Sequence, residues 1–181
     1  MGYEFVKARW FTPGRGGVKI ELIVIHSMEA PKSEGRARST AHFFQVEENE
    51  SSAHLCCDDK EVIQCVGFED IAFQCRNANH NGIGIEHAGY AKQTQDEWLD
   101  EYGKAMLELS AAAAAVVCKQ FDIPVQKAEF AAADDPHVTK PGFVAHHDVP
   151  LHGSHWDPGT GFPWDFYLGR VQFYFDQQNA A

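Results

Sequence analysis

The sequence has none of the features that mark membrane, secreted or nucleic-acid-binding proteins. It contains no apolar run of about 18 residues, so no transmembrane helix is predicted. Its first residues lack the basic-then-apolar order of a signal peptide, so we expect synthesis without one. Only 15 basic residues stand against 26 acidic ones, and the net charge of -11 opposes binding to nucleic acid or to an anionic membrane. We therefore expect neither as a partner.

Cysteine is scarce and odd in number. The five residues Cys56, Cys57, Cys65, Cys75 and Cys118 include no Cys-x-x-Cys pair, which excludes zinc-ribbon and dithiol redox motifs. An odd number also excludes a complete disulfide framework. We expect small buried thiols in a reducing compartment, with a bridge between Cys57 and Cys65 across a hairpin as the alternative.

Internal repeats and Pro/Ser-rich linkers are also absent, and the only low-complexity tract is an alanine run at 111–115. The 181 residues, 44% of them apolar and 23% charged, have the size and composition of one globular domain. We therefore expect one domain over residues 1–181, built around a single core.

The order of elements follows from apolar periodicity and turn residues. The run at 18–26 is β-branched and almost wholly apolar, as in a strand buried on both faces. A capping box of Thr94 and Glu97 opens a helix that should end near Phe121, because Pro124 cannot continue it. Further strands are expected at 52–57, 61–66, 82–89 and 142–149, helices at 34–45 and 164–175, and a long loop at 128–142. This mixture predicts an α/β fold with a central mixed sheet flanked by helices.

Histidine is abundant, and four of the ten residues fall between positions 146 and 155. Candidate metal ligands lie at the ends of separated elements: His26 after the first long strand, the pair His146 and His147 after a late strand, and Asp157. Two imidazoles and a carboxylate suit Zn²⁺, which in catalytic sites takes three protein ligands and leaves a position for water. A strand-end histidine alone is more typical of an ordinary half-buried side chain, so the joint pattern carries the prediction.

Five segments, in this order along the chain, resemble one family. They are LIVIHSMEAP (22–31), SSAHLCCDDKEVIQCV (51–66), IGIEHAG (83–89), AHHDVP (145–150) and HWDPGTGFPW (155–164). On these segments, which cover most of residues 18–168, the chain resembles the type-2 N-acetylmuramoyl-L-alanine amidases. That family shares a fold with peptidoglycan recognition proteins and with phage lysozymes of the amidase type. The resemblance implies a single domain of that fold, which cuts the amide between N-acetylmuramic acid and L-alanine of peptidoglycan.

The resemblance also implies a metal site with one Zn²⁺ per chain. The family's first zinc-ligating histidine falls at His26, the second at His146 and the carboxylate ligand at Asp157. His147 is the rival for the second position, because it is adjacent. We favour His146, since the family pattern of histidine, any residue, then an acid fits His146 to Asp148. If the pair ends a strand, His147 points away from the metal.

Two further roles carry over from the family. Glu86 matches the carboxylate that acts as general base, and His155 matches a lysine or histidine that stabilises the oxyanion. Where many relatives have a substrate-facing histidine, this chain has Gln74 or Cys75. We read His54 as a buried residue behind the site. Five histidines have no assigned role, and most of them are expected on the surface: His42, His80, His87, His137 and His152.

The leading hypothesis is thus a zinc amidase acting on peptidoglycan, with a phage endolysin as the biological setting. In that setting the protein stays in the host cytoplasm until it is released to the cell wall. A cytoplasmic cell-wall recycling amidase is an alternative. A module that binds peptidoglycan without cutting it is a second alternative, disfavoured because every candidate ligand and the base are present. A monomer is the default expectation.

Overall fold

A six-stranded sheet forms the centre of the computed structural model, which describes residues 2–151 and 153–179. In spatial order its strands are β1 (Glu4–Phe5), β5 (Val62–Gln64), β4 (Leu55–Cys57), β7 (Gly82–His87), β3 (Leu22–Ser27) and β10 (Gly142–Ala145). Strands β4, β7, β3 and β10 are parallel, whereas β5 runs antiparallel to β4 and parallel to β1. The mixed sheet predicted from the sequence is confirmed.

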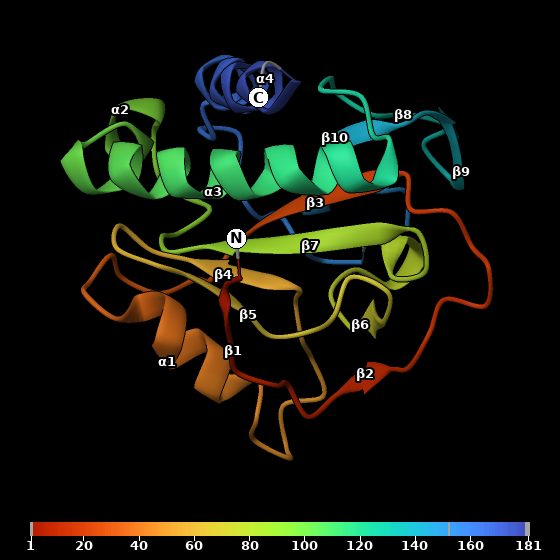
Figure 1. Ribbon diagram of the computed structural model, residues 1–181, viewed down its shortest axis with the longest axis horizontal. Helices are drawn as coiled ribbons and strands as arrows, with labels where there is room; N and C mark the ends of the chain where they lie inside the picture. The colour runs from red at the N-terminus through yellow and green to blue at the C-terminus, as the bar shows by residue number, and fades with distance from the viewer. Residues whose placement is uncertain (1, 152, 180–181) are drawn as a thin grey trace.

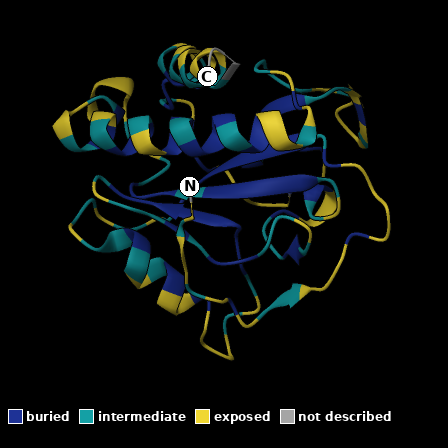
Figure 2. Cartoon of the chain, viewed as in Figure 1, coloured by how far each residue is buried: buried dark blue, intermediate teal, exposed yellow. Residues whose placement is uncertain are grey.

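Helices cover both faces of this sheet (Figure 1). Helices α3 (Glu101–Phe121) and α4 (Trp164–Asn179) lie on one side, and α1 (Arg36–Phe43) lies on the other. All six residues of β3 are buried, as its continuous apolar run predicts for a strand covered on both faces. Figure 2 shows the central strands buried and the outer helix faces exposed. None of the helices in the described ranges is long and apolar enough to cross a membrane.

The parallel strands bring the candidate residues to one edge of the sheet. His26 of β3 lies directly opposite Glu86 of β7 in the strand register. Ala145, the last residue of β10, lies opposite Ile25 of β3, so that His146 follows beside His26. In parallel sheets, binding sites form beyond the carboxyl ends of the strands. This topology therefore places the candidate site at the carboxyl edge.

The helix predicted from Thr94 is in fact two helices, α2 (Gln95–Trp98) and α3. The predicted capping box of Thr94 and Glu97 is confirmed and opens α2. Asp100 then adopts an extended backbone, and its carboxylate accepts a hydrogen bond from Gly103 N at 2.7 Å. This N-cap starts a new helix. The apolar periodicity of the sequence therefore continues from α2 into α3, although the helical hydrogen bonding is interrupted between them.

The prediction of a long loop at 128–142 is wrong. The segment forms a hairpin of β8 (Glu129–Ala132) and β9 (Asp135–Lys140). Phe130 and Val138 pair across it and pack against the cluster that contains Val24. Two prolines hid this signal, but Pro141 follows β9, and Pro136 lies in a two-stranded ribbon, where each strand has a free edge at which proline removes no ladder hydrogen bond.

Several element ends also differ from the predictions, because apolar residues continue into adjoining loops. Strands β3, β4 and β5 occupy only parts of 18–26, 52–57 and 61–66, although β3 extends to Ser27, and α1 occupies part of 34–45. The strand expected at 142–149 ends at Ala145, and a 3₁₀ turn, η2 (His146–Asp148), carries the histidine pair. The remaining short elements are β2 (Phe11–Thr12), β6 (Ile71–Ala72) and η1 (Arg76–Ala78).

The five cysteines, all within the described ranges, are free and buried thiols, as expected. The alternative bridge between Cys57 and Cys65 does not form, because the two side chains belong to core clusters on opposite faces of the sheet. Cys65 instead lies near Cys56, with 3.8 Å between the sulfur atoms.

Two of the histidines without an assigned role in the binding of metal prove to be structural. His54 is fully buried, as expected, and His87 is also fully buried, an exception among the five histidines of which most were expected on the surface. His87 donates from Nδ1 to His26 O at 3.1 Å and accepts at Nε2 from Ser110 Oγ at 2.7 Å. Because Tyr167 Oη reaches Ser110 at 2.8 Å, a buried chain of hydrogen bonds ties the end of β3 to α3 and α4. His42, His80 and His137 are exposed, and His152 lies outside the described residues.

A buried arginine, not singled out in the sequence, holds the loops beneath the site. Arg15 is 7% exposed and donates to the carbonyl oxygens of four residues, and its Nη2 lies 2.9 Å from His54 Nε2. The four acceptors are Phe68, Asn79, His80 and Gly82. Since the four acceptors lie between positions 68 and 82, the Arg15 side chain fixes the segment that leads into β7.

Replacing Arg15 with alanine is expected to lower the free energy of unfolding by about 3 kcal/mol, because it leaves several buried carbonyls without a donor. Arg9, which pairs with Glu47 at 2.9 Å on the surface, supplies the matched control. Arg9→Ala should cost under about 1 kcal/mol. Urea denaturation of both variants measures the difference, and equal midpoints would contradict the structural role of Arg15.

Candidate functional site

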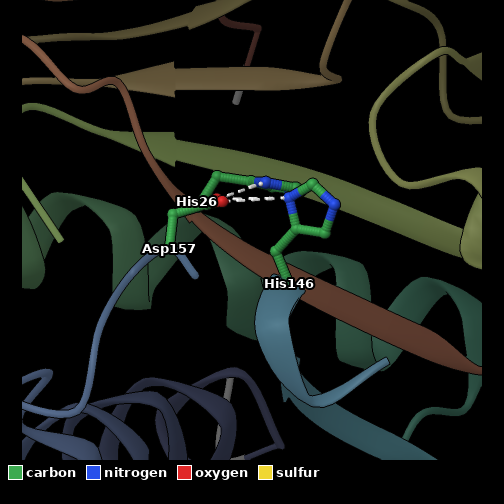
Figure 3. Close-up of side chains that lie close together, drawn as sticks. All are labelled: His26, His146 and Asp157. Carbon is green, nitrogen blue, oxygen red and sulfur yellow. Dashed lines mark hydrogen bonds and ion pairs between the residues drawn. The ribbon is translucent and has the colours of Figure 1, made fainter. Parts of the chain in front are cut away.

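Three buried side chains meet at the carboxyl edge of the sheet (Figure 3). His26 comes from β3, His146 from the turn after β10, and Asp157 from the loop before α4. Asp157 Oδ2 lies 2.9 Å from His26 Nδ1 and 3.3 Å from His146 Nδ1. One ligand atom from each residue lies within 4.8 Å of the others, and His26 is far along the chain from His146 and Asp157, which are 11 positions apart.

These distances fit a tetrahedral metal ion. Ligand atoms held about 2.0–2.1 Å from such an ion lie about 3.3 Å from one another. The nitrogen of each histidine is already within 3.3 Å of an Asp157 oxygen. The donor set of two imidazoles and a carboxylate is one that zinc takes in catalytic sites. The residues therefore fit a divalent metal without rearrangement of the backbone.

The charges within the cluster compensate one another. Burial opposes ionisation of Asp157, but hydrogen bonds from His146 and His26 outweigh it and hold the pKa of Asp157 below its usual value. Burial likewise opposes the charged form of His26, yet the hydrogen bond to Asp157 and the charge of Glu86 raise the pKa of His26 to about 9. Burial lowers the pKa of His146. One carboxylate thus faces one charged and one neutral imidazole.

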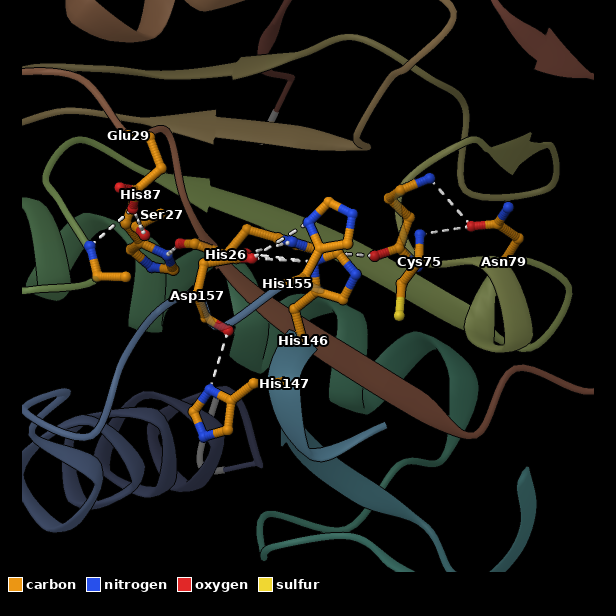
Figure 4. Close-up of polar contacts among 12 residues, drawn as sticks. His26, Ser27, Glu29, Cys75, Asn79, His87, His146, His147, His155 and Asp157 are labelled. Atoms are coloured by element: carbon orange, nitrogen blue, oxygen red, sulfur yellow. Dashed lines mark hydrogen bonds and ion pairs between the residues drawn. The ribbon is translucent and has the colours of Figure 1, made fainter. Parts of the chain in front are cut away.

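The structure separates the two rival histidines. His146 points toward His26 and Asp157, whereas His147 points to the other side of the Asp157 segment (Figure 4). His147 Nδ1 lies 3.1 Å from the backbone oxygen of Asp157, and its backbone N–H also donates to that oxygen. The pair lies in a 3₁₀ turn rather than at a strand end, so strand alternation is not the cause of the divergence. His147 instead fixes the backbone of Asp157.

Gln74 holds His26 from behind. Its Oε1 accepts a hydrogen bond from His26 Nε2 at 2.6 Å, which leaves Nδ1 facing Asp157. The amide packs over Gly84, where an added Cβ would lie 2.6 Å from Gln74 Oε1. Asn79 Oδ1 accepts from the backbone N–H groups of Gln74 and Cys75 and so anchors the loop (Figure 4). Sequence reasoning placed Gln74 at a substrate-facing position but missed this contact.

Glu86 stands beside the cluster without being part of it. The Oε2 atom of Glu86 is buried and has no hydrogen-bond partner in residues 2–151 and 153–179. Burial raises the pKa of Glu86 to about 7, and the charges of Asp157 and Glu29 add to the shift while His26 opposes it. A carboxylate with a buried, unpartnered oxygen and a pKa near neutrality can accept and return a proton.

His155 lies at the rim of the cluster. Its ring stacks on His146 with 4.2 Å between centroids, and its Nδ1 lies 3.8 Å from Asp157 Oδ1. The side chain is 60% exposed, unlike the three buried members. His155 can therefore reach a molecule bound over the cluster.

A groove of 450 Å³ opens over these residues. Its floor contains His26, Glu86, His146 and Asp157, and its walls include residues of α1 and of the segment 51–52. All five predicted site residues line it: His26, Glu86, His146, His155 and Asp157.

Comparisons with known proteins identify the family of the chain. The model of the N-acetylmuramoyl-L-alanine amidase family matches residues 16–160. N-acetylmuramoyl-L-alanine amidase A of Achromobacter lyticus is 26% identical over 154 residues, which span 82% of this chain and 81% of that protein.

Solved structures share the fold. The hydrolase AmiA of Staphylococcus aureus, crystallised with its ligand, superposes with a TM-score of 0.70 at 15% identity and covers 99% of this chain and 86% of its own. A mutant endolysin from Bacillus subtilis superposes with a TM-score of 0.62 at 14% identity, covering 94% of this chain and 99% of its own. The family match spans most of the chain and includes every segment that forms the site, and the chain therefore belongs to the type-2 N-acetylmuramoyl-L-alanine amidase family.

Proposed function

We propose that this amidase is zinc-dependent and that one Zn²⁺ per chain is held by His26, His146 and Asp157. The observation that carries the proposal is a preassembled set of two imidazoles and a carboxylate beside a glutamate with a buried, unpartnered oxygen. The family's reaction is hydrolysis of the amide between N-acetylmuramic acid and L-alanine in peptidoglycan.

The roles of the residues follow from their positions. Zinc, when bound, supplies Lewis acidity that lowers the pKa of water and polarises a carbonyl. Glu86 takes the proton of the attacking water and returns it to the amine of L-alanine as the carbon–nitrogen bond breaks. His155 donates a hydrogen bond to the oxygen on which negative charge develops. Gln74 and the His147 contact hold His26 and Asp157 in place.

The reaction is tested on purified peptidoglycan by its products. An amidase releases new L-alanine N-termini, which amine labelling detects, and no new reducing sugar ends. We expect the first product only. Reducing ends without free amines would instead indicate cleavage of the glycan and contradict the proposal.

The biological setting that we propose is phage lysis, with a monomeric protein held in the host cytoplasm until release. Support comes from the sequence resemblance to phage amidases and from the shared fold with an endolysin. Expression in the cytoplasm should leave host cells intact until the inner membrane is permeabilised, after which turbidity should fall within minutes. Intact cells after permeabilisation, with active enzyme present, would favour the role in recycling.

Removing His155 is expected to slow the reaction without loss of metal. His155→Ala should lower turnover about 10²-fold, the size typical of one oxyanion donor, with zinc content unchanged. His137, exposed on the β9 hairpin, gives the matched control. Full activity of His155→Ala would refute its role.

Removing the support of His26 is expected to weaken metal binding. Gln74→Ala should lower zinc affinity about 10- to 100-fold, as for other groups that orient a metal-ligating histidine. Competition with a chromogenic chelator measures the affinity directly, and Gln45→Ala on the exposed surface after α1 serves as the control. Unchanged zinc affinity in Gln74→Ala would show that the hydrogen bond to His26 has no positioning role.

A further inference from the structure

A second hollow adjoins the groove and has no role in the chemistry described above. It has a volume of 580 Å³, within the range of about 300–1,000 Å³ typical of ligand sites. The linings of the groove and the hollow share a single residue, His155. The two adjacent histidines line different cavities: His146 lines the groove and His147 lines the hollow. The two cavities thus meet at His155, on the rim of the metal cluster.

The walls of the hollow are held in a fixed position. One wall is the backbone at 91–93 and the other is the loop that supplies Asp157. Gly159, with a φ of +86°, lets these two segments touch, since a Cβ there would lie 1.8 Å from Ala91 O. The hollow is therefore formed before any ligand binds.

The lining of the hollow differs chemically from that of the groove. Its side chains include Trp156, Lys92, Gln93, Ser154 and Thr160, and no carboxylate, although the chain carries a net charge of -11. Trp156 is 72% exposed, the largest fraction among the exposed large apolar side chains in the described ranges. An exposed indole surrounded by hydrogen-bonding side chains, with no carboxylate among them, suits a ring that has an apolar face and a polar edge. The pyranose rings of an N-acetylated glycan have that form.

The substrate has two arms, and the reaction requires the amide between them to lie at the metal cluster. The two arms are the stem peptide and the glycan strand. If one of them occupies the groove, the other extends past His155 into the hollow. The groove contains Arg36, a cation that can pair with the carboxylates of the stem peptide. On the basis of the proposed function, we infer that the hollow is a glycan subsite and that Trp156 stacks on a sugar ring of the strand. The peptide arm then lies in the groove along α1.

The test separates the two arms by binding them individually to the zinc-loaded protein. One probe is a peptide-free oligosaccharide of alternating N-acetylglucosamine and N-acetylmuramic acid, and the other is the sugar-free stem peptide. Calorimetry should show that Trp156→Ala raises the Kd for the oligosaccharide about tenfold or more while the Kd for the peptide stays within about twofold. Trp156→Phe should restore most of the glycan affinity. Phe173→Ala, an exposed aromatic on α4 outside both cavities, should change neither value.

An unchanged oligosaccharide Kd in Trp156→Ala, or no oligosaccharide binding by the unaltered protein, would overturn the inference. An equal loss for both probes would also overturn it, because Trp156 would then act on the loop as a whole. These outcomes do not depend on turnover. If the unaltered protein binds both probes yet releases no L-alanine termini, the proposed function fails and the glycan subsite stands.

Discussion

Replacing Asp157 with alanine should abolish zinc binding and hydrolysis together. Among residues 2–151 and 153–179, only Asp157 has a carboxylate that approaches both histidines, at 2.9 Å from His26 Nδ1 and 3.1 Å from His146 Nδ1. Without it two imidazoles remain, one ligand short of the three that catalytic zinc sites use. Elemental analysis should find zinc well below one ion per chain, and release of L-alanine termini should fall below detection. Asp157→Asn keeps the shape of the side chain and removes its charge. Loss of zinc in this variant as well would show that the effect of Asp157→Ala does not come from misfolding.

The two adjacent histidines provide a matched pair for the same measurement. His146→Ala should lose zinc, because its Nδ1 faces Asp157. His147→Ala should retain zinc, since His147 contacts only the backbone oxygen of Asp157 within the cluster. Retained zinc in His146→Ala with loss in His147→Ala would overturn the choice of ligands.

Replacing Glu86 with glutamine should leave zinc in place and lower turnover about 10³-fold, within the range of general acid–base catalysis. The amide keeps the size of the side chain and removes its ability to accept a proton. Glu86 is opposite His26 in the sheet but belongs to neither hydrogen bond of the metal cluster, so metal affinity should not depend on it. Zinc content and kcat, measured on the same preparation, separate the two effects.

Glu48→Gln, which removes an exposed carboxylate outside the groove, controls for the change in net charge. A Glu86→Gln variant that loses zinc would make Glu86 a ligand. A variant with full turnover would exclude it as the base. Either result would require another group to handle the proton.

The parts of the site that the sequence predicts are those fixed by strand order. His26 and Glu86 each lie next to last in a buried strand, and parallel pairing brings such positions to the same edge. Asp157 was a candidate ligand by its residue type, but only the resemblance assigned it to the site, because it lies in a loop whose path depends on contacts between distant segments. The support from Gln74 was hidden for the same reason: it reaches His26 across 48 positions of the chain.

Elements of the fold that sequence reasoning missed depend on tertiary contacts. The β8–β9 hairpin forms because Phe130 and Val138 pack on a neighbouring core cluster, which outweighs the local signal of its prolines. No role was predicted for His87, and most histidines of that kind were expected on the surface, because histidine is usually exposed or half-buried. Its burial is stabilised by Ser110 and Tyr167, residues that come near it only in the folded chain.

The most direct test of the central claim pairs metal content with product release. Zinc is measured in the purified protein, and release of L-alanine termini from peptidoglycan is followed with a chelator, without it, and after zinc is restored. The account predicts one zinc per chain, loss of release with the chelator and recovery with zinc. A zinc-free protein that binds peptidoglycan and releases no amines, or release that persists without metal, would contradict it.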